Sequence, residues 1–136
     1  MADTPAEAMA VAASATFGFY AQAHLSHWNV VGADFPQLHG FFGGLYEEAW
    51  EAVDRLSEAL RTLDEPVPAT VFSTPGEVPA DAAAMVAALS DANDAVLQVL
   101  EDAYRACAEE PALQNVLQDR LEAHEKHGWM LRATEG

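Results

Sequence analysis

The chain has 136 residues, the usual size of one globular domain, so a single domain spanning residues 1–136 is expected. Hydrophobic residues make up 51% of the chain, which argues against wholesale disorder. Acidic residues outnumber basic ones 22 to 6, and the formal charge is -16. Such a charge repels nucleic acid and concentrates metal cations, although a plain solvated acidic surface explains it equally well.

The single cysteine, Cys107, has no partner for a disulfide within the chain. Residues 1–10 lack the basic start and apolar run of a secretory leader. No stretch approaches the length and apolarity of a membrane span. We therefore expect a cytoplasmic protein with no membrane association.

The first expected helix runs from about Pro5 to Trp28, and residues 29–33 break it. Asp34 followed by Pro36 is a helix-start signal. The second helix then continues to about Leu63, some 28 residues or ~40 Å. It carries an apolar stripe at three- and four-residue steps, made of Phe35, Leu38, Phe42, Leu45, Ala49, Val53, Leu56 and Leu60.

Residues 64–79 contain four prolines and one glycine and form a connector. Extended at ~3.3 Å per residue, the connector can run the whole length of a bundle. A third helix starts between Pro79 and Asp81 and continues to Cys107, and a fourth follows Pro111. The fourth helix has one stripe made of Leu113, Leu117, Leu121, His124, Gly128 and Leu131. The pattern predicts an all-α four-helix bundle with a long crossover between helices two and three.

Four side chains are candidate metal ligands. Asp54 and Glu58 lie four residues apart on the second helix, so their carboxylates point the same way. His27 and His39 flank the break between the first two helices, and a chain that folds back there brings both imidazoles to one end. Oxygen and nitrogen ligands without a thiolate suit iron or manganese, and zinc also binds such a set.

His39 and Asp54 are 15 residues apart, which is ~22 Å along one helix, so they cannot hold a common ion within one chain. Two copies of the second helix that pack antiparallel about a two-fold axis near Glu47 would place His39 of one copy opposite Asp54 and Glu58 of the other. The dimer would then carry two equivalent sites.

Plainer explanations exist for the same residues. A lone histidine near a helix end is more often a surface or core residue than a ligand. Asp54 and Glu58, together with Arg55 and Arg61, would also suit an exposed face with ordinary ion pairs. The alternative is therefore a non-enzymatic helical cage or interaction module.

The sequence resembles the Dps mini-ferritins over residues 20–65 and again at the last helix. The matching residues of the first region are His24, Leu25, Ser26, His27, Trp28, Asn29, Val30, Gly32, Phe35, His39, Phe42, Tyr46, Asp54 and Glu58. Those of the last helix are residues 124–131, His-Glu-Lys-His-Gly-Trp-Met-Leu.

The resemblance implies a ferritin-like bundle with a short extra helix in the crossover, assembled as a hollow dodecamer. Such a cage oxidises ferrous iron with hydrogen peroxide or O2 and stores the ferric mineral. By position, His27 and His39 would bind iron together with Asp54 and Glu58 of the two-fold mate. Trp28 resembles a tryptophan that takes up an oxidising equivalent, and an anchor in the dimer contact is the other explanation.

The chain departs from the family at the position four residues after His39. Many members have an acidic residue there, and this chain has Gly43. One carboxylate is thus missing, so the second iron position is expected to be weak or to be completed by water. Glu47 lies ~12 Å along the helix from either site and is a poor substitute. His24 is an auxiliary candidate, although a hydrogen-bonding core histidine suits it better.

Other features of the sequence argue against nucleic-acid binding and against a second type of di-iron site. Members that bind DNA use a Lys-rich tail, and residues 1–7 contain no Lys or Arg, so no nucleic acid is expected. No histidine has Glu three residues before it, which excludes a di-iron site of the Glu-x-x-His type.

His124 and His127 lack a nearby third ligand, so a surface role is favoured. Three glycines within the second helix, residues 40, 43 and 44, predict close approach of another helix.

Overall fold

The computed structural model describes residues 4–136. Residues 1–3, which belong to the amino-terminal segment that lacks Lys and Arg, lie outside the described residues. Its elements, in chain order, are α1 (Pro5–Asn29), α2 (Phe35–Arg61), the 3-10 helix η1 (Ala69–Val71), α3 (Ala82–Ala106) and α4 (Pro111–Glu135). No strand occurs within residues 4–136. The predicted all-α fold is therefore confirmed, and the helix ends lie within a few residues of those expected.

Local signals fix the helix ends. The Thr4 side chain accepts a hydrogen bond of 3.1 Å from the Glu7 backbone N–H, and Asp81 caps α3 in the same way at 3.0 Å. Between α1 and α2, Gly32 has φ +118°, a conformation that side-chain-bearing residues rarely adopt. This turn reverses the chain within a few residues and sets α2 beside α1.

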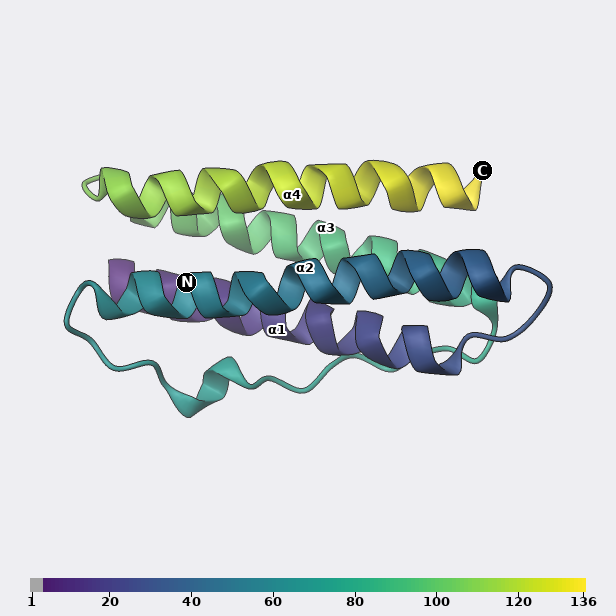
Figure 1. Ribbon diagram of the computed structural model, residues 1–136. Helices are drawn as coiled ribbons and strands as arrows, with labels where there is room; N and C mark the ends of the chain where they lie inside the picture. The colour runs from purple at the N-terminus through teal and green to yellow at the C-terminus, as the bar shows by residue number, and fades with distance from the viewer. Residues whose placement is uncertain (1–3) are drawn as a thin grey trace.

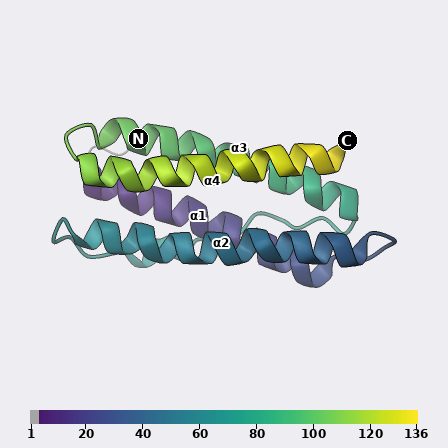
Figure 2. The ribbon, with the colours of Figure 1, turned by 45° about the horizontal axis from the view of Figure 1, so that its top comes forward.

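The helices form two antiparallel pairs, α1 with α2 and α3 with α4, and the pairs pack through α1 against α3 and α2 against α4 (Figures 1 and 2). After α2 the chain runs back along the bundle before α3 begins at the opposite end (Figure 1). Consequently α2 and α3 run in the same direction, as the predicted long crossover requires. The short extra helix expected in the crossover is η1.

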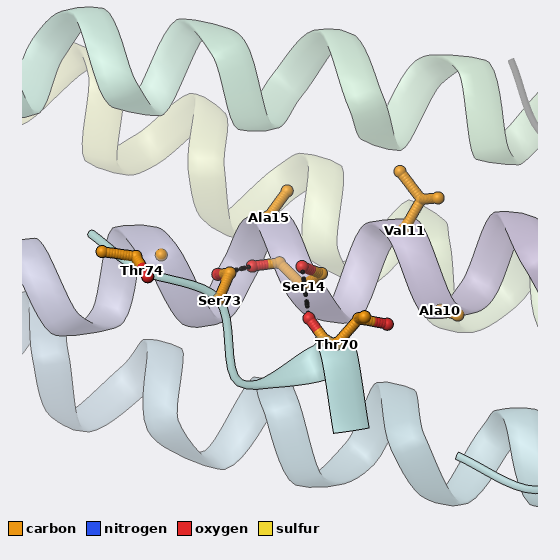
Figure 3. Close-up of a pocket in the computed structure, with 8 residues that line it drawn as sticks. Ala10, Val11, Ser14, Ala15, Thr70, Ser73 and Thr74 are labelled. Carbon is orange, nitrogen blue, oxygen red and sulfur yellow. Dashed lines mark hydrogen bonds between the residues drawn. The ribbon is translucent and has the colours of Figure 1, made fainter. Parts of the chain in front are cut away.

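Two hydrogen bonds hold the crossover against α1 (Figure 3). The Ser14 hydroxyl donates to the Thr70 carbonyl at 3.0 Å, and the Ser73 hydroxyl donates to the Ser14 carbonyl at 2.7 Å. Phe72 packs edge-on against Phe17 with ring centroids 5.5 Å apart. These contacts keep the crossover on the outer side of the α1 and α2 pair.

The core is aliphatic and aromatic, and the predicted stripe of α2 lies in it from Leu38 to Leu60. Phe35 is the exception, because it is 39% exposed and stacks on His39 with ring centroids 4.9 Å apart. It stands in the first turn of α2, beyond the end of the packed core. Phe35 is therefore the one member of the apolar stripe that is exposed in the single chain.

One helix, α3, is long and apolar enough to cross a membrane by length and composition alone, with a mean hydropathy of 1.2. The expectation that no stretch approaches this limit was too strong. Alanine-rich composition raises the hydropathy, and α3 packs against α1 and α4 along the bundle. The same helix therefore serves as a core element of the fold.

Candidate metal centre

His27 in the last turn of α1 and His39 in the second turn of α2 lie against each other. Their rings stack with centroids 3.7 Å apart and an interplanar angle of 18°. The His27 Nδ1–H donates to the His39 carbonyl, and the His39 Nδ1–H donates to the His27 carbonyl, each at 2.7 Å. The turn through Gly32 makes this reciprocal pair, because it brings α2 back along α1.

The reciprocal hydrogen bonds determine which ring nitrogens of His27 and His39 are available to bind a metal ion. A carbonyl oxygen only accepts hydrogen bonds, so each Nδ1 must carry a proton. In the neutral imidazoles both Nε2 atoms then keep a free lone pair, which is the form that binds a metal ion. The two predicted histidine ligands are thus brought together and oriented within one chain.

Gly43 explains how the His27 ring fits. A Cβ atom at this position would lie 3.2 Å from His27 Nδ1 and 3.3 Å from its Cε1, closer than most real Cβ contacts. The predicted close approach at the glycines of α2 is therefore present at Gly43, where α1 provides it. At Gly40 and Gly44 no described atom lies within 4 Å of an added Cβ.

His24 lies one turn before His27 and is half-buried among aromatic rings. It stacks on Tyr46 at 3.8 Å and 4°, and on Trp28 at 3.8 Å and 32°. Its Nδ1 hydrogen bonds to the Tyr20 hydroxyl at 2.9 Å. Burial lowers the pKa of His24, and the nearby His27 lowers it further. These contacts suit the expected hydrogen-bonding histidine, while its auxiliary ligand role stays a prediction.

Asp54 and Glu58 lie on the exposed face of α2, in the half of that helix away from the histidine pair. Among residues 4–136, no hydrogen bond or ion pair joins either carboxylate to another side chain, and Arg55 pairs instead with Asp119 at 2.9 Å. The local ion pairs considered for this face are therefore not formed. Asp54 borders a hollow of about 580 Å³ that Trp50 and Phe72 also line.

One chain alone does not complete a site. No group of three or more His, Cys, Asp or Glu side chains within the described part of the chain is placed to hold a metal ion. The histidine pair and the carboxylate pair lie far apart along α2, as the 15-residue spacing predicts. Glu47 is exposed on α2 between them. Trp28 is 64% exposed beside the histidines.

A second polar cluster lies inside the bundle, where the sequence predicted none. Arg120 binds both carboxylate oxygens of Glu48, one of them at 2.8 Å, and donates to His124 Nε2 at 2.9 Å. His127 Nε2 donates to Glu48 Oε1 at 2.9 Å. His124 Nδ1–H donates to Asn93 Oδ1 at 2.9 Å. The cluster thus ties α2, α3 and α4 together.

His124 is fully buried and His127 nearly so, so the surface role favoured for them was wrong. Position in the apolar stripe of the fourth helix was the signal for burial of His124. Burial lowers the pKa of His124 to about 3, with the Arg120 charge and His127 adding to the effect. Burial opposes ionisation of Glu48, but Arg120 and His127 outweigh it and hold the pKa of Glu48 well below its usual range. Arg120 is the cation at the centre of this cluster.

Comparison with known proteins covers the whole bundle. The family model described as a Ferritin-like domain matches residues 7–135. An uncharacterised low temperature-induced protein of a Nostoc species is 32% identical over 119 residues, which are 79% of this chain and 66% of that protein, so the chain spans about two thirds of that relative. The DNA protection during starvation protein of Brevibacillus brevis is 35% identical over 127 residues, 84% of this chain and 83% of that protein. A crystal structure of a Dps protein from Bacillus brevis superposes with a TM-score of 0.85 over 100% of both chains at 26% identity.

Proposed function

The chain belongs to the Dps family of ferritin-like proteins, and on this basis we propose that it oxidises ferrous iron between paired subunits and stores the ferric product in a cage. The observation that carries the proposal is the reciprocal hydrogen bonding of His27 and His39, which leaves both Nε2 atoms free. Each site would combine this pair with Asp54 and Glu58 of a two-fold mate. Ferrous iron and peroxide or O2 are the substrates.

Exposed apolar side chains support a second copy as the partner on this face. Trp28, Val31, Trp50 and Phe72 are each more than half exposed. They belong to the end of α1, the turn after it, α2 and the crossover, beside the two ligand pairs. A patch of this kind marks a protein contact, and a two-fold contact would cover it on both copies at once.

The chain's own residues have distinct tasks in this chemistry. His27 and His39 supply neutral nitrogen ligands whose orientation is fixed before iron arrives. Asp54 and Glu58 supply negative charge, which favours the ferric over the ferrous state. The Phe35 ring stacks on His39, and the Trp28 ring packs on His24, one turn before His27. With Gly43 in place of a carboxylate, the first ion is bound tightly and the second weakly.

The test is anaerobic titration of ferrous iron into the assembled protein, followed by peroxide. We expect one tight ion per site and ferric absorbance on oxidation. Asp54→Asn removes one ligand charge at almost constant size and should weaken the tight ion at least about tenfold. Glu101→Gln, an exposed change of a carboxylate on α3, is the matched control and should leave the affinity unchanged. Zinc is a redox-silent probe for the same site.

The competing function is a non-enzymatic helical cage in which Asp54 and Glu58 are interface charges. An intact assembly that binds no ferrous iron and yields no ferric absorbance with peroxide would establish that alternative. DNA protection, which the name of the Brevibacillus relative describes, is not part of the proposal, because the chain carries a formal charge of -16.

A further inference from the structure

Oxidisable aromatic side chains form a continuous series that starts at the histidine pair. The Tyr46 ring lies 5.1 Å from the His27 ring, between centroids, and 6.1 Å from the Tyr20 ring. The Tyr20 ring in turn lies 5.0 Å from Trp50. The series runs along α1 and α2 at the edge of the bundle, from the predicted iron ligands to the exposed Trp50.

Tyr20 differs from Tyr46 in having a base in contact with its hydroxyl. The Tyr20 O–H can donate to His24 Nδ1 at 2.9 Å, and the His24 ring is fixed by stacking between Tyr46 and Trp28. Among the described residues, no hydrogen bond is formed by the Tyr46 hydroxyl. A phenol gives up an electron far more readily when its proton can move to a neighbouring base. The geometry thus singles out Tyr20 as the donor.

We propose that Tyr20, paired with His24, supplies the second electron that peroxide requires when a single ferrous ion occupies the site. The inference rests on the proposed ferroxidase function and follows from Gly43, which leaves the second iron position weak. Hydrogen peroxide needs two electrons to become water. A single ferrous ion supplies one, and the alternative fate of the peroxide is release of a hydroxyl radical.

The reaction balances with the groups present. One ferrous ion, one hydrogen peroxide, the Tyr20 phenol, neutral His24 and two protons give ferric ion, two waters, the Tyr20 phenoxyl radical and protonated His24. The O–O bond breaks, and iron and Tyr20 are each oxidised by one electron. A later ferrous ion reduces the radical, and the proton returns from His24 Nδ1 to the phenolate oxygen. Over the cycle two ferrous ions are oxidised for each peroxide.

The residues around Tyr20 and His24 favour temporary oxidation of Tyr20. Tyr20, His24, Tyr46 and Trp50 line a hollow of about 340 Å³ whose remaining lining residues are Glu47 and Glu51. Carboxylates near an oxidised aromatic ring or a protonated imidazole stabilise the positive charge. Trp50 is 52% exposed, so the series ends at the surface that a second copy would cover.

The experiment loads the assembled protein anaerobically with one ferrous ion per site, adds one peroxide per ion and freezes the mixture within milliseconds for electron paramagnetic resonance. We expect a phenoxyl signal that narrows when the protein contains ring-deuterated tyrosine. Tyr20→Phe should remove most of this signal and raise the hydroxyl radical captured by a spin trap several-fold. Tyr104→Phe changes a tyrosine on α3 outside the series and is the matched control.

The outcomes separate this inference from the ferroxidase function. An unchanged signal and an unchanged spin-trap yield in Tyr20→Phe would overturn the inference, as would full ferric formation with no radical in the unaltered protein. If no ferric iron forms, the ferroxidase proposal fails instead. A photo-excited ruthenium oxidant then tests the Tyr20 and His24 pair in the iron-free protein, where a radical at Tyr20 whose formation slows in D2O supports it. Equal radical yields from the unaltered protein and Tyr20→Phe would reject it.

Discussion

Gly43 governs the space around His27. An added Cβ would meet the imidazole at 3.2 Å, and the ring is held in place by its hydrogen bond to the His39 carbonyl. Any side chain at this position therefore pushes the ring by a few tenths of an ångström. A carboxylate here would nevertheless stand one turn after His39, with its Cβ nearest to Nδ1 and Cε1 of His27.

Gly43→Asp should strengthen the weaker iron position by about tenfold and speed iron oxidation by peroxide, because a carboxylate ligand is gained. Gly43→Ala adds the same Cβ without a ligand, so it measures the steric cost alone and should give no gain at the second position. Anaerobic ferrous titration of the two variants makes the comparison. Two equally tight ions in the unaltered protein would contradict the ligand assignment, and assembly must be confirmed by native mass.

At the scale of elements, the cluster of Glu48, Arg120, His124 and Asn93 links three helices through buried polar contacts. The ion pair joins a buried guanidinium to a carboxylate that is 37% exposed, and loss of Glu48 would leave the Arg120 charge buried without its partner, which is costly. Arg120 is 4% exposed, and its Nε has no hydrogen-bond partner within the described residues. The cluster therefore sets the register of α4 against α2.

The same cluster predicts sensitivity to acid. Folding lowers the pKa of His124 from its ordinary value of 6.5 to about 3. Between pH 3 and pH 6.5 the imidazole is therefore protonated in the unfolded chain but neutral in the folded chain. The contribution of His124 to the free energy of unfolding is fully present above pH 6.5. As the pH is lowered below this value, the free energy of unfolding falls by up to about 1.4 kcal/mol per pH unit because of this group. Glu48 adds a loss of the same sign below its ordinary value of 4.5.

Urea unfolding followed by circular dichroism between pH 5 and 7 at fixed chain concentration measures this slope. His124→Gln keeps an acceptor and a donor without a titrating ring and should flatten the slope. Glu125→Gln, an exposed change at the adjacent residue, should preserve it. Equal slopes in the unaltered protein and in His124→Gln would show that His124 does not titrate differently in the folded chain.

The proposed iron site needs a second copy of the chain to supply its carboxylates, and storage of the ferric product would need a closed shell. We predict a dodecamer, twelve chains of 14.6 kDa and therefore about 175 kDa. Native mass spectrometry or sedimentation near neutral pH decides this. A stable species no larger than a dimer would leave the ferric product without a container, and a monomer would leave both halves of the site unpaired.

We also predict no useful affinity for DNA at physiological salt. Binding of this kind depends on Lys and Arg that neutralise phosphates and release counterions, and the chain has 6 basic residues against 22 acidic ones. A gel shift with plasmid DNA at roughly 0.15 M salt is the measurement. Binding that survives removal of divalent cations by a chelator would contradict the prediction, whereas binding that disappears would reveal metal bridging.

Sequence alone predicted the helices, the crossover and the distance between the two candidate ligand pairs. Periodicity, proline and capping residues act locally, and 15 residues on a helix fix ~22 Å between His39 and Asp54 whatever surrounds them. Contacts between helices were decided only by the tertiary structure. These contacts join residues on different helices. They include the hydrogen bonds of His27 and His39 to each other's carbonyl, the packing of the His27 ring on Gly43, and the contacts that bury His124. Spacing within one helix cannot predict which side chain a second helix presents to it.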